Sequence, residues 1–92
     1  MFGHAGDGNL HPTPIKNPKF KMDEWYEKLD ALLLELYKTA IELGGTISGE
    51  HGIGSKRNKY ISMALEPAQI EIMKKIKKAF DPNLILNPGK IF

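Results

Sequence analysis

The stretch DEWYEKLDALLLELYKTAIELGG, residues 23–45, decides the fold because it predicts one long amphipathic helix. Its apolar side chains recur at three- and four-residue spacing, which places them on one helix face: Trp25, Leu29, Leu32, Leu33, Leu36, Tyr37, Ala40 and Ile41. Asp23 can cap the first turn, and Gly44-Gly45 supplies a stop. With 92 residues in all, the chain has room for one small domain, residues 1–92, built on this helix.

Shorter elements surround the long helix. A second helix is expected over residues 67–80, with Pro67 in its first turn and four lysines in the half where the helix dipole favours positive charge. Residues 46–48 are expected to form a short strand, residues 1–20 are rich in turns and prolines, and residues 80–92 are expected to run extended. The predicted class is α+β, a small antiparallel sheet with helices packed on one face.

Composition excludes several classes of function. The chain has no cysteine, so a bound metal must be held by nitrogen and oxygen ligands. A formal charge of +2 is too small to indicate nucleic-acid binding. No apolar run approaches the roughly 18 residues that span a bilayer, and no signal peptide is visible, which favours a cytoplasmic protein.

The stretch FGHAGDGNLHP, residues 2–12, carries two of the three histidines. If Asp7-Gly8 forms a two-residue hairpin turn, His4 lies directly opposite His11, with Cβ atoms about 4.5–5.5 Å apart. Two imidazoles at that separation can reach one metal ion. The alternative is a pair of surface histidines beside a turn.

A second polar stretch, GGTISGEHGIGSKR at residues 44–57, adds a carboxylate and the third histidine. Glu50 offers an oxygen ligand, and His51 offers a titratable group. Two histidines with one carboxylate form a recurrent catalytic zinc set that leaves a position open for water or substrate. The alternative is a solvated Glu50–His51 surface pair. The same stretch lacks the glycine and lysine spacing of a phosphate-binding loop.

Three motifs together, GHAGDGNLHP, GGTISGEHGIGSKRNKY and FDPNLILNPGKIF, resemble the C-terminal end of the FAD-linked oxidases. The resemblance implies a flavoprotein that oxidises small 2-hydroxy acids of the glycolate or D-lactate type. It implies that His4, His11 and Glu50 hold a divalent metal, zinc or manganese. It also implies that His51 takes the hydroxyl proton and that Asn87 lies close to the flavin. The family often has lysine at the position of Arg57. Arginine keeps the charge but has a different shape, so the resemblance does not imply a specific substrate contact there.

The resemblance also implies what this chain alone lacks. The family holds FAD in an N-terminal domain of roughly 200 residues, for which 92 residues have no room. The chain is therefore expected to supply the metal ligands and the base, to bind no FAD and to be inactive by itself. Apolar surface and strand edges left open are expected to make it a homo-oligomer.

Two other classes of function remain open from the residues. One is a metal-dependent hydrolase that uses His4, His11 and Glu50 to activate water. The other is a non-catalytic oligomerisation module.

Overall fold

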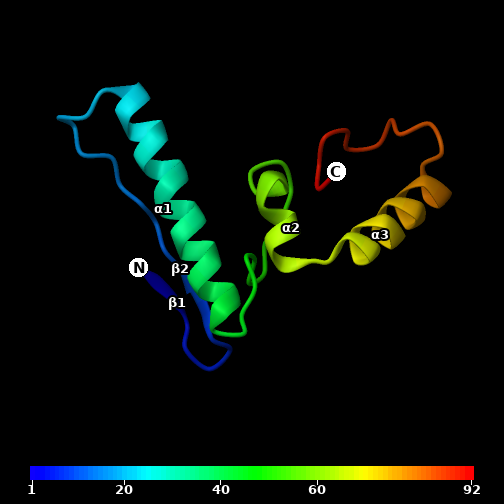
Figure 1. The fold of residues 1–92 in the computed structure, drawn as a ribbon, viewed down its shortest axis with the longest axis horizontal. Coiled ribbons are helices and arrows are strands. Elements are labelled where there is room, and N and C mark those ends of the chain that lie inside the picture. Colours follow the sequence, from blue (N-terminus) through cyan, green and yellow to red (C-terminus); the bar gives the residue numbers. More distant parts are fainter.

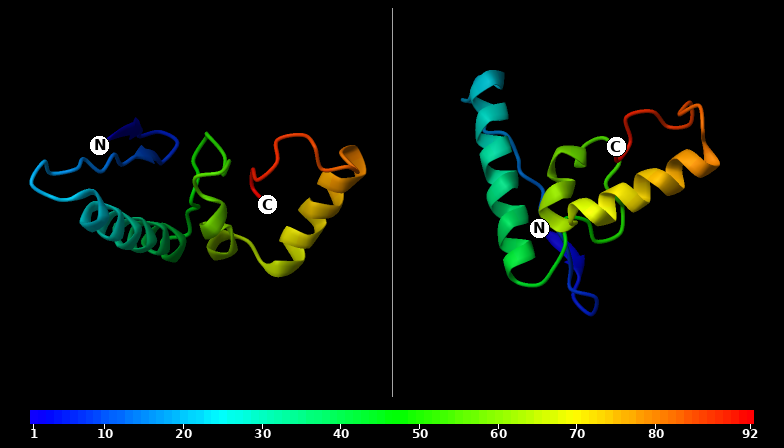
Figure 2. Two further views of the ribbon diagram at one scale, coloured as in Figure 1. Left: turned by 90° about the horizontal axis from the view of Figure 1, so that it is seen from above. Right: turned by 45° about the vertical axis from the view of Figure 1, so that its right-hand side comes forward.

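The computed structural model describes residues 1–92, and it confirms the α+β class. In chain order the elements are β1 (Phe2–His4), β2 (Asn9–His11), α1 (Met22–Glu42), the 3₁₀ helix η1 (Asn58–Tyr60), α2 (Ile61–Ala64) and α3 (Pro67–Phe80). The two strands form one antiparallel sheet. α1 and α3 lie on two arms that diverge from a centre formed by α2 and its flanking loops, and the hairpin lies near the C-terminal end of α1 (Figures 1 and 2).

Helix α1 confirms the main prediction but begins slightly earlier than expected. Lys21 is the N-terminal capping position, with an extended backbone, so the prediction that Asp23 is the cap is wrong. Asp23 and Glu24 instead lie in the first turn, where negative charge stabilises the helix dipole. The Glu24 carboxylate also accepts a hydrogen bond of 3.4 Å from the Lys21 amide, which a helix start otherwise leaves unsatisfied.

The end of α1 is fixed by the glycine pair, as predicted. The Gly45 amide donates to the carbonyl of Ala40 at 2.8 Å, and the Gly44 amide donates to that of Ile41 at 2.9 Å. These two bonds form the Schellman motif, which satisfies carbonyls of the last helical turn. The chain consequently turns sharply into the loop that carries Glu50.

The hairpin forms, but the predicted register is wrong. His4 pairs with Asn9, and His11 pairs with Phe2, around a four-residue loop of Ala5–Gly8. A two-residue turn of type I′ at Asp7-Gly8 needs positive φ at both residues, yet of the two only Gly8, with a φ of 67°, has it. The chain forms two overlapping turns instead, in which the amides of Asp7 and Gly8 donate to the carbonyls of His4 and Ala5.

The core is small and lies between α1, the loop after it and the η1–α2 segment. Its buried members are Tyr37, Ile47 and Tyr60, and the two tyrosine rings meet edge to face with centroids 4.9 Å apart. The strand predicted for residues 46–48 is absent, because no second strand lies beside it to form a ladder. Ile47 is buried there as a loop residue that anchors the loop to the core.

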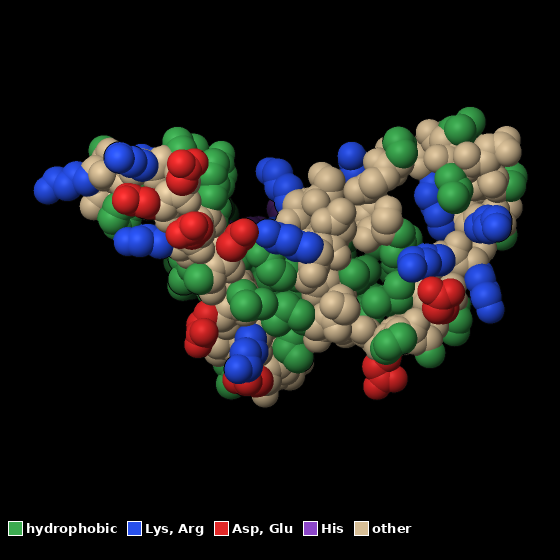
Figure 3. All heavy atoms as spheres, turned by 45° about the horizontal axis from the view of Figure 1, so that its top comes forward, with side chains coloured by type: hydrophobic (Ala, Val, Ile, Leu, Met, Phe, Trp, Pro, Cys, Tyr) green, Lys and Arg blue, Asp and Glu red, His purple; other side chains and the backbone are tan.

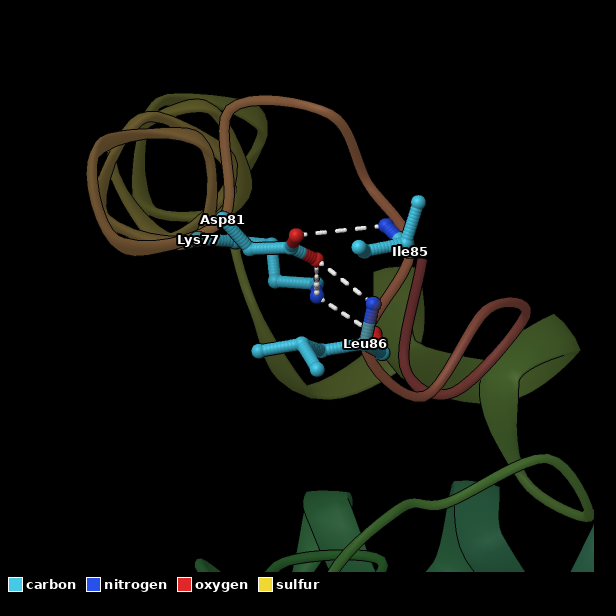
Figure 4. A network of polar contacts seen from close by, with 4 residues as sticks. All are labelled: Lys77, Asp81, Ile85 and Leu86. Atoms are coloured by element: carbon cyan, nitrogen blue, oxygen red, sulfur yellow. Dashed lines mark hydrogen bonds and ion pairs between the residues drawn. The ribbon is translucent and has the colours of Figure 1, made fainter.

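Helix α3 has the predicted bounds, but the segment after it is not extended as expected. The Asp81 carboxylate accepts hydrogen bonds from the amides of Ile85 at 3.2 Å and Leu86 at 3.0 Å, which folds the chain back (Figure 4). Lys77 ties the turn to the helix by donating to Asp81 at 2.5 Å and to the Leu86 carbonyl at 2.6 Å. None of the helices combines the length and the apolar content needed to cross a bilayer.

Candidate metal centre

Three side chains from the two polar stretches converge on one point. His11 Nε2 lies 3.1 Å from Glu50 Oε1, and His4 Nε2 lies 3.9 Å from Glu50 Oε2. One ligand atom from each of His4, His11 and Glu50 falls within 4.8 Å of the others. The structure thus brings together the three residues that the sequence singled out.

The corrected register explains how the histidines still meet. His4 faces Asn9, and His11 is two residues further along the same strand, so both histidines project from the same face as diagonal neighbours. Their rings lie 6.1 Å apart, centroid to centroid. Phe2, directly opposite His11, stacks on its ring at 4.9 Å. A register error of one residue would have separated the histidines, whereas an error of two does not.

The Glu50 loop is held over the hairpin by a contact that was not predicted. A side chain at Gly49 would overlap the Asn9 amide, with its Cβ 2.6 Å from Asn9 Cγ. Gly49 therefore lets strand β2 and the loop approach closely, and the next residue along the loop is Glu50. From the sequence, a glycine at position 49 indicates only that another group can come close to the backbone there. The fold shows that this group is the Asn9 side chain.

Arg57 braces the same loop from the other side. Its guanidinium donates to the Tyr37 hydroxyl at 3.3 Å and to the Gly52 carbonyl at 3.0 Å. These bonds attach the loop to α1 and the core. No sequence signal indicated this structural role.

His51 lies at the edge of the cluster. Its Nε2 is 3.5 Å from Glu50 Oε1, and its ring centroid is 5.7 Å from that of His11. The His51 side chain is 72% exposed, compared with 20% for His11. His11 is thus set into the hairpin, whereas His51 is open to an incoming molecule.

A pocket of about 350 Å³ begins at Glu50. The loop lines one side of it, and Ile61, Ala64 and Leu65 from α2 and its end contribute apolar surface. A volume of this size, with a polar group at one edge, falls in the range of small-molecule sites.

Asn87 is not part of this cluster. It lies in the turn after α3, with a φ of 47°, and lines a separate pocket of about 430 Å³ together with lysines of α3. The C-terminal segment returns toward the centre, where the Ile91 amide donates to the Gly54 carbonyl at 2.7 Å.

The donor set fits a divalent ion. Zinc with ligand bonds of 2.0–2.1 Å places tetrahedral ligand atoms roughly 3.4 Å apart, so side-chain rotations are enough to close the observed separations. Two imidazoles and one carboxylate suit zinc, and manganese also accepts such nitrogen and oxygen ligands.

Comparison with known proteins identifies relatives along the whole chain. Residues 1–91 match the family described as FAD linked oxidases, C-terminal domain. The chain is 53% identical over 91 residues to the glycolate oxidase subunit GlcD of Bacillus subtilis, which covers 99% of this chain and 19% of that protein. It is 48% identical over 90 residues to a D-lactate dehydrogenase of Anaerostipes hadrus. This alignment covers 98% of this chain and 19% of that protein.

A third relative, a D-2-hydroxyglutarate dehydrogenase of Stutzerimonas stutzeri, is 44% identical over 91 residues, with 99% of this chain and 20% of that protein covered. The chain therefore spans about one fifth of the length of these curated relatives. No solved structure matches it.

Proposed function

The chain belongs to the family of FAD-linked oxidase C-terminal domains, and we propose that it forms the metal- and proton-handling part of a flavoprotein that oxidises small 2-hydroxy acids. The convergence of His4, His11 and Glu50 carries the proposal. Relatives named for glycolate, D-lactate and D-2-hydroxyglutarate support the substrate class, since all three compounds are 2-hydroxy acids.

The three converging residues hold the divalent ion. His11 is the most enclosed of the three ligands, because Phe2 stacks on its ring and its side chain is only 20% exposed. Glu50 reaches both histidines and neutralises part of the ion's charge. When bound, the ion supplies a positive charge that attracts a substrate carboxylate and lowers the pKa of the neighbouring hydroxyl.

His51 is the general base. It is exposed, its Nε2 lies 3.5 Å from Glu50 Oε1, and the free nitrogen of a neutral imidazole can accept a proton. His51 lies beside the three ligands but is not one of them. It can therefore take the hydroxyl proton of a substrate that binds at this centre. The pocket that begins at Glu50 has room for the small carbon chain of such an acid.

FAD is the electron acceptor of the complete protein. Of the contacts to it, this chain contributes Asn87 in the turn after α3. The main FAD-binding domain is assigned to sequence outside these 92 residues, which make up about one fifth of the relatives. For the location of the complete protein, the cytoplasm is a prediction from the sequence.

Zinc titration of the purified chain by calorimetry tests the metal assignment. His11→Ala should weaken binding by at least about 100-fold, because even residues that only support a metal-bound histidine contribute about 10–100-fold. His51→Ala is the matched control and should bind as the wild type does. Equal affinity in the wild type and His11→Ala would remove His11 from the site.

The role of His51 is tested in a complete flavoprotein that contains this segment. His51→Ala should leave metal content intact and lower turnover by about 10²–10⁴-fold, the usual contribution of a general base. Glu50→Ala should lower metal content and turnover together. Equal loss of metal in both variants would show that His51 is a ligand.

A further inference from the structure

The molecule is far more open than its size requires. Only five of 92 residues are buried, and the Cα radius of gyration is 15.7 Å. A compact domain of this length has a radius of roughly 12 Å. The accessible surface is 7462 Å², whereas a compact monomer of this mass exposes about 5,400 Å². The excess of roughly 2,000 Å² per chain is more than the roughly 800 Å² that each partner buries in a standard protein interface.

Much of this open surface is apolar and is arranged on the two arms. On α3, Ile72, Ile76 and Phe80 follow one another at four-residue spacing and are 55–86% exposed, and α3 buries none of its side chains. On α1, Met22, Tyr26 and Leu34 are 51–57% exposed and lie on a similar four-residue row, which Asp30, paired with Lys59, interrupts. Rows with this spacing are the ridges that interlock when two helices pack.

The two rows carry opposite charge at their edges. α1 contains six acidic and two basic side chains, a net charge of −4, whereas α3 contains four lysines and one glutamate, a net charge of +3. Most acidic side chains on the face shown in Figure 3 lie on the α1 arm, and lysines gather on the α3 arm. Glu27, beside Tyr26, and Lys75, beside Ile76, take part in none of the ion pairs of the chain.

We infer that the α3 row of one chain packs on the α1 row of a second copy. Two α3 helices facing each other would bring lysines together, whereas α3 on α1 joins opposite charges. The two arms diverge within one chain, so they present the rows to a neighbour (Figure 1). One two-fold axis makes both α3–α1 contacts at once and gives a closed dimer. This inference does not rest on the metal site, which lies on neither row.

Sedimentation velocity of the 92-residue chain tests the inference. The wild type should sediment with twice its mass of 10.3 kDa. Ile76→Glu should be monomeric, with far-UV circular dichroism to check its helices. Lys75→Glu and Glu27→Lys should each weaken the dimer about tenfold or more, and the double variant should recover most of the loss, because it restores an opposite-charge pair.

Lys78→Glu is the matched control. Like Lys75, Lys78 takes part in none of the ion pairs, but it lies about 200° around the helix from Ile76 and away from the row, so the same charge change should leave the dimer unchanged. A monomeric wild type overturns the inference and leaves the α3 row to another occupant, such as the FAD-binding part of the complete protein. A dimer that persists in folded Ile76→Glu, or a double variant no tighter than either single one, also overturns it.

Discussion

At the scale of single residues, the candidate centre depends as much on Gly49 and Asn9 as on the ligands. The ligands come from two segments about 40 residues apart, so something must hold the loop on the hairpin. The absence of a side chain at Gly49 permits this approach, because a Cβ there would overlap the Asn9 side chain, and the next residue after the contact is Glu50. Arg57 adds a second attachment through Tyr37.

The first prediction concerns this contact. Gly49→Ala should weaken zinc binding about tenfold or more, because the new methyl group overlaps the Asn9 amide and pushes Glu50 away from the histidines. Asn9→Ala combined with Gly49→Ala should recover much of the affinity, since the obstacle is removed. Zinc titration of both single variants and the double variant measures the coupling.

Gly6→Ala is the control for that series, because a side chain at Gly6 meets nothing within 4 Å. It should bind zinc like the wild type. Simple addition of the Gly49→Ala and Asn9→Ala effects would show that the two residues act independently.

At the scale of elements, the sequence predicted what local signals determine. Helices α1 and α3 follow from apolar periodicity and from Gly44-Gly45 and Pro67, all of which act within a few residues. The hairpin register was wrong because it depends on the φ angle that Asp7 adopts, and an Asp-Gly pair permits more than one turn. His4 and His11 converged nevertheless, because the face of a strand repeats every two residues.

The segment after α3 was predicted to run extended, and its folded-back shape depends on Asp81. The carboxylate is buried beside Lys77 and accepts two backbone amides (Figure 4). The hydrogen bond from Lys77, and then those from the Leu86 and Ile85 amides, hold the pKa of Asp81 below its ordinary value. An aspartate at a helix end gives no sequence signal of these longer-range bonds.

The second prediction follows from that lowered pKa. The Asp81 carboxylate binds a proton more tightly in the unfolded chain than in the folded turn. The free energy by which its hydrogen bonds stabilise the turn is therefore fully present above the ordinary aspartate pKa of about 3.9. It is lost as the pH falls through the lower pKa of the folded turn. The NMR signals of the Ile85 and Leu86 amides should therefore titrate with a midpoint below about 3.9. In Asp81→Asn the same signals should not respond over this range, and a midpoint above 3.9 in the wild type would contradict the prediction.

At the scale of the whole molecule, the sequence predicted the family and expected apolar surface to be left open, but it did not predict which helix faces stay exposed. Periodicity shows which face of a helix is apolar, and it does not show whether anything covers that face. Ile72, Ile76 and Phe80 form an apolar row on α3, yet all three are exposed. The core that does form, around Tyr37, Ile47 and Tyr60, joins α1 to the Glu50 loop and thereby serves the site.

The third prediction concerns the flavin. The proposed function gives this chain a single contact with FAD, Asn87, so the purified chain should be colourless and should not oxidise glycolate, D-lactate or D-2-hydroxyglutarate with added FAD. The visible spectrum and dye-coupled turnover measure this. A stoichiometric flavin band near 450 nm, where oxidised flavin absorbs, would show that the chain holds the cofactor alone.

The fourth prediction is that zinc stabilises the whole chain. Because so few residues are buried, an ion that links His4 and His11 of the hairpin to Glu50 of the loop adds a cross-link that the small core does not supply. An ion that binds only the folded form adds about 2.7 kcal/mol at a free concentration 100 times its Kd. In a domain of this size that should raise the Tm by roughly 10–20 °C.

Thermal unfolding followed by circular dichroism, with and without zinc, measures this shift. His11→Ala should show little shift at the same zinc concentration, and a chelator should reverse the shift in the wild type. The shift should shrink in acid, because an imidazole must be neutral to bind the ion. An equal shift in the wild type and His11→Ala would mean that zinc binds elsewhere, and the join between hairpin and loop would then rest on the contact of Asn9 with Gly49.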